Sequence, residues 1–429
     1  MSATARSTAQ ELARRRALLG TPYRLFYSDP VALVRGEGTW LYDADGNRYL
    51  DAYNNVPCVG HAHPTVVAAI SAQAALINTH TRYLSPVTLD YAEALLATMP
   101  AELQHVMFTC SGSEANDLAL QIARAWTGNA GVIITRHAYH GTTTATAAIS
   151  PSLGRAALPV EVELVDPPPA QTDSTEAVDG FGRRVAAAVD RLAQRGSRPA
   201  ALVTDSVFSS DGLVPAPAGF LRPAAEAIRA AGGLYIADEV QAGFGRTGRM
   251  WGFERHGVTP DIVTLGKPMG NGYPLAGLAA RPELVDAFGE KARYFNTFAG
   301  TPVACAAGHA VLQVLADEQL IERAGTVGGQ LLKRIAGLKA HPAVTDVRGV
   351  GLFVAVEVAA ADAGPFTAAA IVDRMRDDGV LAGVTGPGSR IVKIRPPLVF
   401  GETEIEPLAS ALERAFDRPG DNKRPSINT

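Results

Sequence analysis

Short, almost wholly apolar runs alternate with amphipathic stretches through the middle of the chain. Five such runs lie at residues 105–109, 131–135, 200–205, 233–238 and 261–265. Between the first two, Ala115, Leu118 and Ile122 recur at the spacing of one helix face. Apolar runs of this length that are separated by helices are typical of a parallel sheet covered on both faces. The pattern therefore predicts a doubly wound α/β core over roughly residues 60–315.

The two ends of the chain have a different pattern. Residues 31–50 indicate strands and turns, and from residue 320 onward helices alternate with strands near residues 348–358 and 390–394. Neither end can bury a core alone, and a chain of 429 residues is longer than one core supports. We therefore expect residues 1–60 to form an N-terminal arm and part of a small α+β domain. Residues 61–318 would form the large, ligand-binding domain, and residues 319–429 the rest of the small one.

Composition and charge exclude several classes of partner. The net charge is −4 and no block of Lys or Arg stands out, so we expect neither a nucleic-acid nor a membrane partner. The longest apolar stretch, about residues 303–316, is too short to span a bilayer. Cys58, Cys110 and Cys305 are scattered and odd in number, which suits a reducing compartment, so we expect a cytoplasmic protein.

The first candidate for ligand chemistry is Ser111-Gly112-Ser113, which follows an apolar run and opens an amphipathic helix. The backbone N–H groups at a helix start are unpaired and lie at the positive end of the helix dipole. They bind a phosphate well, and Ser113 adds a hydroxyl. Taken alone, a motif of this kind is more often an ordinary serine N-cap.

A second motif, residues 137–141, directly follows the next apolar run. Its Tyr139 is placed to stack on a flat heteroaromatic ring at the carboxyl end of a strand, although a tyrosine at the rim of a core is commoner. The two histidines of this motif, together with His61 and His63, have no third ligand or carboxylate at helical spacing. We therefore expect no metal site.

Two further apolar runs end on a carboxylate and on a lysine. Asp238 closes the run at 233–238, where its charge can keep a pyridine nitrogen protonated, unless it is simply a solvated carboxylate. Lys267 lies between the run at 261–265 and a glycine-rich turn, with Pro268 restricting its backbone. Most lysines are solvated surface groups. In an apolar setting, however, desolvation lowers the pKa of a lysine and frees its amine to form an imine.

The order of these motifs matters more than any one of them. Each follows a successive strand of one predicted sheet, and such sheets bind ligands outside the carboxyl ends of their strands. A phosphate cup, a stacking aromatic ring, a carboxylate and an amine that converge there fit a flat, phosphorylated cofactor with a basic ring nitrogen and an aldehyde. Pyridoxal 5'-phosphate has these features.

From about Tyr23 to Phe416, the chain resembles the class III aminotransferase family of fold-type I pyridoxal-phosphate enzymes. Besides the motifs above, the resemblance rests on Leu50-Asp51, Gly60-His61-Ala62-His63-Pro64, Phe244-Gly245-Arg246-Thr247-Gly248 and Arg348-Gly349-Val350-Gly351-Leu352. It implies an α/β fold in which a large domain carries a mostly parallel seven-stranded sheet. A smaller α+β domain would be formed by both chain ends.

The resemblance also implies roles for individual residues. Lys267 is similar to the Schiff-base lysine, which moves the proton between substrate and cofactor, and Asp238 to the partner of the ring nitrogen. The other implied cofactor contacts are Ser111, Gly112, Ser113, Tyr139, His140, Asp205 and Gln241. Thr297 matches the threonine that reaches the phosphate from the neighbouring subunit, which implies a homodimer with shared active sites.

Within the family, the chain resembles both the phospho-lyases of O-phosphoethanolamine or phosphohydroxylysine and the alanine–glyoxylate type transaminases. It departs from many members at Asp205-Ser206, where they have Glu-Pro, and at Lys393, where carboxylate-binding members have arginine. Arginine makes a two-pronged bond to a carboxylate, whereas lysine suits a phosphate equally well. The candidate substrate contacts are Tyr53, Arg82, Lys393 and Arg395.

Two activities are consistent with these residues. We expect an aminotransferase that moves an amino group from an amine or amino acid to a keto acid through Lys267. The alternative is a phospho-lyase that eliminates phosphate and ammonia from O-phosphoethanolamine or a related phospho-amine. A non-catalytic sensor that only binds the cofactor would need an appended partner-binding module, and the sequence shows none.

Overall fold

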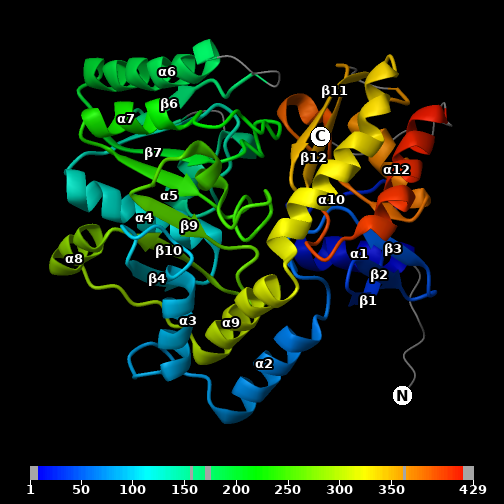
Figure 1. Ribbon diagram of the computed structural model, residues 1–429, viewed down its shortest axis with the longest axis horizontal. Helices are drawn as coiled ribbons and strands as arrows, with labels where there is room; N and C mark the ends of the chain where they lie inside the picture. The colour runs from blue at the N-terminus through cyan, green and yellow to red at the C-terminus, as the bar shows by residue number, and fades with distance from the viewer. Residues whose placement is uncertain (1–7, 155–157, 170–174, 361–363, 419–429) are drawn as a thin grey trace.

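The computed structural model describes residues 8–154, 158–169, 175–360 and 364–418. It has a large lobe and a small lobe, with helices α9 (Pro302–Asp317) and α10 (Leu320–Ile335) running from one to the other (Figure 1). Among the described residues, no helix is long and apolar enough to cross a bilayer.

The large lobe is built on a seven-stranded, mostly parallel sheet with the strand order β4-β10-β9-β8-β7-β5-β6. Strand β10 runs antiparallel to both of its neighbours, and the other pairs are parallel. The strands are β4 (His105–Thr109), β5 (Gly131–Thr135), β6 (Val162–Val165), β7 (Pro199–Asp205), β8 (Leu234–Asp238), β9 (Ile262–Leu265) and β10 (Ala276–Ala280). The predicted mostly parallel sheet is confirmed, and the five apolar runs agree with strands to within one residue.

Alternation along β5 separates two faces of this sheet. Ile133 belongs to the buried cluster that contains residues of α6 (Thr175–Gln194) and α7 (Arg222–Ala230). Its neighbours Val132 and Ile134 belong instead to the cluster with residues of α4 (Gly112–Thr127) and α8 (Pro282–Lys291). Because successive side chains of a strand point to opposite faces, these helices cover the sheet on both sides, as Figure 1 shows.

Helix α9 and two helices that pack on it share a start signal. The starts of α2 (Pro64–Leu76), α3 (Pro86–Leu96) and α9 each carry a proline, whose missing N–H has no intrahelical partner there in any case. Both α2 and α3 pack on α9.

The other helices outside the small lobe's α11 (Ala368–Asp377) and α12 (Glu402–Asp417) are α1 (Thr8–Leu19), α5 (Thr144–Ala148) and the short helices η1 (Pro151–Leu153), η2 (Gly252–His256), η3 (Ala336–Ala340) and η4 (Pro387–Ser389).

The small lobe combines both ends of the chain, as the sequence predicts. One four-stranded sheet joins β1 (Leu33–Glu37), β2 (Trp40–Asp43) and β3 (Arg48–Asp51) to the C-terminal β13 (Val380–Leu381), which lies parallel to β3. The other has the order β11-β12-β15-β14, with β11 (Val344–Val350), β12 (Phe353–Val358), β14 (Gly383–Thr385) and β15 (Ile391–Ile394). Helices α11 (Ala368–Asp377) and α12 (Glu402–Asp417) pack on each other in this lobe.

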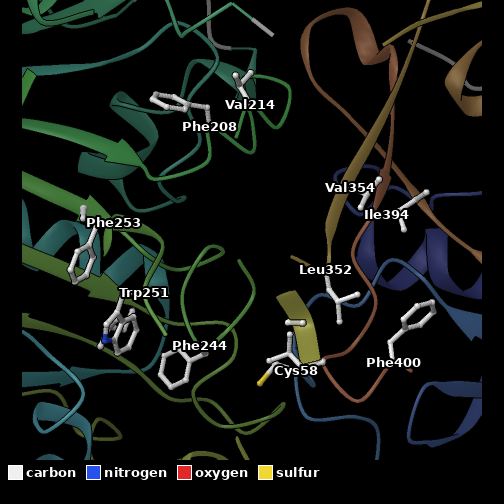
Figure 2. Packing of buried hydrophobic residues seen from close by; sticks show 14 of the residues in the cluster. Cys58, Phe208, Val214, Phe244, Trp251, Phe253, Leu352, Val354, Ile394 and Phe400 are labelled. Atoms are coloured by element: carbon white, nitrogen blue, oxygen red, sulfur yellow. The ribbon is translucent and has the colours of Figure 1, made fainter. Parts of the chain in front are cut away.

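The two lobes share buried packing. Figure 2 shows members of the largest buried cluster, which extends from Phe244 and Trp251 of the large lobe to Leu352 and Phe400 of the small one. Polar contacts add to it, because the buried Arg348 guanidinium of β11 donates to the backbone carbonyls of Gly212 and Leu213 (2.7 and 2.8 Å) in the loop after β7. Residues of the small lobe are thereby held against the carboxyl edge of the large sheet.

Candidate active site

A cavity lies at the carboxyl edge of the large sheet, where the segments after β4, β5, β7, β8 and β9 meet. Its lining comprises Gly112, Ser113, Asn116, Tyr139, His140, Gly141, Asp205, Asp238, Val240, Gln241 and Lys267. The structure thus brings together residues of all four sequence motifs at one site. The reason is topological, because the carboxyl ends of parallel strands lie along the same edge of the sheet.

The start of α4 forms one wall of this cavity. Gly112 is packed so closely that an added Cβ would come within 2.8 Å of the Val240 side chain. Gly141 has a φ of +139°, and a Cβ there would lie 2.6 Å from the Ser113 hydroxyl. Ser111 does not line the cavity; its hydroxyl accepts the Glu114 N–H and caps the helix. The backbone at Gly112 and Ser113 is therefore the part of this helix start that could hold an anion in the cavity, whereas Ser111 acts as the N-cap.

Asp238 is a buried carboxylate with three donors. Its Oδ2 accepts from Asn116 Nδ2 (2.9 Å) and pairs with His140 Nδ1 (2.6 Å), while its Oδ1 accepts from the Val240 N–H (3.1 Å). Thr264 in turn donates to Asn116 and fixes the orientation of that amide. A carboxylate offers about four lone-pair sites, so one remains for a donor in the cavity.

The Lys267 ammonium loses its proton more readily than that of an ordinary surface lysine. Burial and, to a smaller extent, the positive charge of Arg395 lower its pKa from 10.5 to about 8, while Asp238 and Asp205 oppose the shift. Because the residue precedes Pro268, its backbone is restricted at the end of β9. At neutral pH, a usable fraction of this lysine is therefore uncharged and nucleophilic.

A chain of polar side chains connects the sheet edge to the small lobe. Gln241 Nε2 donates to Ser209 Oγ (3.0 Å), and Ser209 Oγ donates to the Asp205 carboxylate. Burial raises the pKa of Asp205, and the hydrogen bond from Ser209 opposes that shift. The carbonyl end of Gln241 accepts from Lys393 Nζ (3.1 Å) and from the Arg395 guanidinium.

Lys393 and Arg395 belong to β15 and the residue after it, and both are buried. Arg395 also donates to the carbonyls of Tyr53 and Asn54 and to the side chain of Asn55. No salt bridge to either cation occurs within the described part of the chain. Three of the four predicted substrate contacts, Tyr53 included, therefore gather beside the cavity around Gln241.

Thr297 and Arg82, which the family resemblance also singles out, lie on exposed surface. The Arg82 guanidinium lies 3.8 Å from the centre of the Phe295 ring. Neither side chain lines the cavity of its own chain. Sequence reasoning did not single out Asn116, Gly141, Val240 or Ser209. Asn116 could have been found, because a buried asparagine one turn into an amphipathic helix requires a polar partner.

The residues present fit pyridoxal 5'-phosphate. The start of α4 suits its phosphate, Tyr139 offers a ring face, the vacant lone pair of Asp238 suits the ring nitrogen, and Lys267 supplies an amine for its aldehyde. Within the described ranges, no group of three His, Cys, Asp or Glu residues could hold a metal ion.

Comparisons with known proteins agree with this chemistry. The chain is 39% identical over 421 residues to a Drosophila melanogaster protein named alanine–glyoxylate aminotransferase 2-like, covering 93% of this chain and 85% of that protein. It is 37% identical to ethanolamine-phosphate phospho-lyase homolog 1 of Caenorhabditis elegans, covering 96% and 94%. Among solved structures, a phospholyase from Arthrobacter in complex with phosphoethanolamine matches with a TM-score of 0.91 and 42% identity, covering 95% and 99%. Residues 27–416 match the family described as aminotransferase class-III. The chain belongs to this family of enzymes, and its cofactor is pyridoxal 5'-phosphate.

Proposed function

We propose that this enzyme is a phospho-lyase that eliminates phosphate and ammonia from O-phosphoethanolamine or a related phospho-amine. The observation that carries the proposal is the pair Lys393 and Arg395, which are 7% and 2% exposed beside the cavity. Within the described residues, the hydrogen-bond acceptors of both cations are neutral carbonyl and amide oxygens.

Buried cations without an anionic partner are costly, because the interior solvates charge poorly. Arg348 provides a contrast in the same lobe, since its guanidinium pairs with the carboxylates of Asp346 and Glu357 at 3.0 and 2.7 Å. The charge of Lys393 and Arg395 is left for a ligand to neutralise. The start of α4 already provides for the cofactor phosphate, so a second anion is required, and a doubly charged phosphate ester balances two cations.

The relatives support the same substrate class. The Caenorhabditis elegans protein is named a phospho-lyase homolog, and the Arthrobacter structure is named as a complex with phosphoethanolamine. Both span nearly the whole of this chain.

In this function, each residue at the cavity has a defined task. When bound, the cofactor supplies an electron sink for the carbanion that forms beside the substrate nitrogen. Lys267 would carry the cofactor covalently and then take the proton from the carbon bonded to that nitrogen. Asp238 would keep the ring nitrogen protonated, and Tyr139 would hold the ring by stacking. Arg395 and Lys393 would bind the substrate phosphate and hold its bond to carbon in position.

Transamination is the second candidate. It uses the same Lys267 and Asp238, and the planar Arg395 fork can bind a substrate carboxylate in two-pronged fashion. The Drosophila melanogaster relative, which is named for that activity, supports this candidate.

One assay separates the two activities. Purified, cofactor-loaded enzyme is mixed with excess O-phosphoethanolamine without any keto acid, and free phosphate is counted while the cofactor absorbance is recorded. A phospho-lyase releases phosphate in many-fold excess over enzyme and keeps its cofactor spectrum. A transaminase consumes one equivalent of amine and stops until a keto acid is added. Lack of phosphate from both O-phosphoethanolamine and phosphohydroxylysine would refute the proposal.

We also propose that the enzyme is a homodimer in which each subunit completes the other's site. Thr297 is exposed between Phe295 and Phe298, which are 40% and 73% exposed. Leu84 is 95% exposed, an unusual state for a large apolar side chain. Sedimentation should give a dimer, and Phe298→Glu should shift it toward the monomer while lowering the affinity for the cofactor. A monomeric wild-type enzyme with full activity would contradict this arrangement.

A further inference from the structure

The ammonium of Lys393 has hydrogen-bonding capacity that the protein does not use. The residue lies on β15, an inner strand of the sheet β11-β12-β15-β14, and pairs with Ala355 of β12 and Gly383 of β14. Within the described chain, its single hydrogen-bond acceptor is Gln241 Oε1, at 3.1 Å. An ammonium has three donors, so two remain for a ligand beside the cavity.

Its neighbour Arg395 is held quite differently. The guanidinium donates to four oxygens, those of Tyr53, Asn54, Asn55 and Gln241, and most of its five N–H groups are therefore engaged. Arginine is also never deprotonated at the pH of an enzyme reaction. Arg395 is thus a fixed positive charge, whereas Lys393 is a cation that can lose a proton.

The surroundings of Lys393 favour that loss. Burial, followed by the positive charges of Arg395, Lys267 and Arg246, holds its pKa well below the usual 10.5, and Asp205 alone acts in the opposite direction. Gln241 is uncharged, so its contact with Lys393 adds no negative charge that would stabilise the ammonium. A lysine replaced by arginine at this position would keep the charge but lose the ability to act as an acid.

Phosphate elimination needs such an acid. When the bond between carbon and the ester oxygen breaks, the electron pair stays on oxygen, and a doubly charged ester would leave as phosphate with three negative charges. That trianion is a strong base and a poor leaving group. A proton delivered to the ester oxygen as the bond breaks lets the product leave with two charges instead.

We propose that Lys393 is this proton donor, while Arg395 holds the charge of the departing phosphate. The inference rests on the proposed phospho-lyase function. Lys267 takes the proton from the carbon bonded to nitrogen, the electrons of that bond form the new carbon–carbon double bond, and Lys393 gives a proton to the ester oxygen as its bond to carbon breaks. One proton is taken up and one is given, so the step needs no oxidant, reductant or further reactant.

The test compares Lys393→Arg and Lys393→Met with the wild type, using cofactor-loaded enzyme in D2O with O-phosphoethanolamine. Lys333→Arg, at an exposed position in the last turn of α10, is the matched control. Three quantities are measured: phosphate release, deuterium at the carbon bonded to nitrogen in recovered substrate, and affinity for inorganic phosphate by calorimetry. Absorbance of the bound cofactor shows whether the site is intact.

We expect Lys393→Arg to slow phosphate release at least about a hundredfold, the lower range for loss of a general acid. Its affinity for inorganic phosphate should stay within about fivefold of the wild type, because the charge is kept. Recovered substrate should accumulate deuterium, because Lys267 still removes and returns the carbon-bound proton while the phosphate cannot leave.

Three outcomes overturn the role of Lys393. They are phosphate release by Lys393→Arg within about fivefold of the wild type, loss of deuterium uptake in parallel with phosphate release, and loss of bound cofactor in both variants. In each of these the wild type still releases phosphate, so the proposed function stands. A wild type that releases none refutes the function and this inference together.

Discussion

Replacing Lys267 by methionine should stabilise the cofactor-free protein at neutral pH. The side chain is partly buried at the wall of the cavity, and its pKa falls from 10.5 to about 8 chiefly because loss of solvent disfavours the charged form. A base whose pKa is lower in the folded state destabilises the fold while it is charged there. That penalty is therefore full below pH 8 and disappears as the pH rises from about 8 to above 10.5.

The size of the pKa shift of Lys267 determines how much the free energy of unfolding changes. With pKa values of 10.5 unfolded and about 8 folded, linkage gives a penalty of about 3 kcal/mol at pH 7 and about 1.4 kcal/mol at pH 9.5. Methionine has a similar length and no charge, so Lys267→Met removes this penalty. Any change in packing is the same at both pH values and cancels from the comparison. The gain in stability should thus shrink by about 2 kcal/mol between pH 7 and pH 9.5.

The assay is urea unfolding of cofactor-free wild type and Lys267→Met at one protein concentration, because an oligomer's stability depends on concentration. Lys333→Met, on the exposed surface of α10, is the control and should show no such pH dependence. A difference between Lys267→Met and wild type that is equal at both pH values, or larger at pH 9.5, would refute the assignment of a depressed pKa to this lysine.

Three further changes test other parts of the site. Asp238→Asn should retain the cofactor but slow product formation at least about a hundredfold, because the ring nitrogen loses its anionic partner; near-normal turnover would exclude that role. Gly141→Ala should weaken cofactor binding at least about tenfold in titrations, because the new Cβ would lie 2.6 Å from the Ser113 hydroxyl. The control is Gly154→Ala, where φ is also positive but no atom lies near the new Cβ, and cofactor binding should not change. Arg348→Met should cost about 2 kcal/mol in urea unfolding, because it removes a buried guanidinium that bonds to Asp346, to Glu357 and to the carbonyls of Gly212 and Leu213. An unchanged midpoint would show that the lobes do not depend on it.

The sequence predicted the sheet and most of the cavity for one physical reason. Wholly apolar runs specify central strands, and residues directly after such strands meet at one edge, so Ser113, Tyr139, Asp238 and Lys267 could be grouped without a structure. Strands β6 and β10 gave weaker signals. The first, Val162–Val165, is interrupted by the charged Glu163, and the second, Ala276–Ala280, consists mainly of small residues with little strand preference.

The surroundings of Lys393 could not be predicted in the same way. Its sequence neighbours indicate a strand, but neither its burial nor its single acceptor follows from local pattern. Both depend on how the small lobe packs against Gln241, which is set by contacts between distant segments such as Arg348 with Gly212. The exposure of Thr297 is likewise a property of the folded chain, and the sequence alone indicated its role only through family resemblance.

The same charges that destabilise this protein also explain its chemistry. The charge of Arg395 lowers the pKa of Lys267 and of Lys393, and Lys267 lowers that of Lys393 as well. None of the three has a carboxylate partner within salt-bridge distance among the described residues. A fold selected only for stability would replace such a cluster with apolar side chains, because buried unpaired cations are costly. The cluster gives the protein an amine at Lys267 that can react when it is uncharged. It also leaves two cations, Lys393 and Arg395, whose charge a bound anion can neutralise. Ligands that neutralise it should therefore stabilise the fold, so a phosphate ester should raise the unfolding temperature more than the same molecule without its phosphate does.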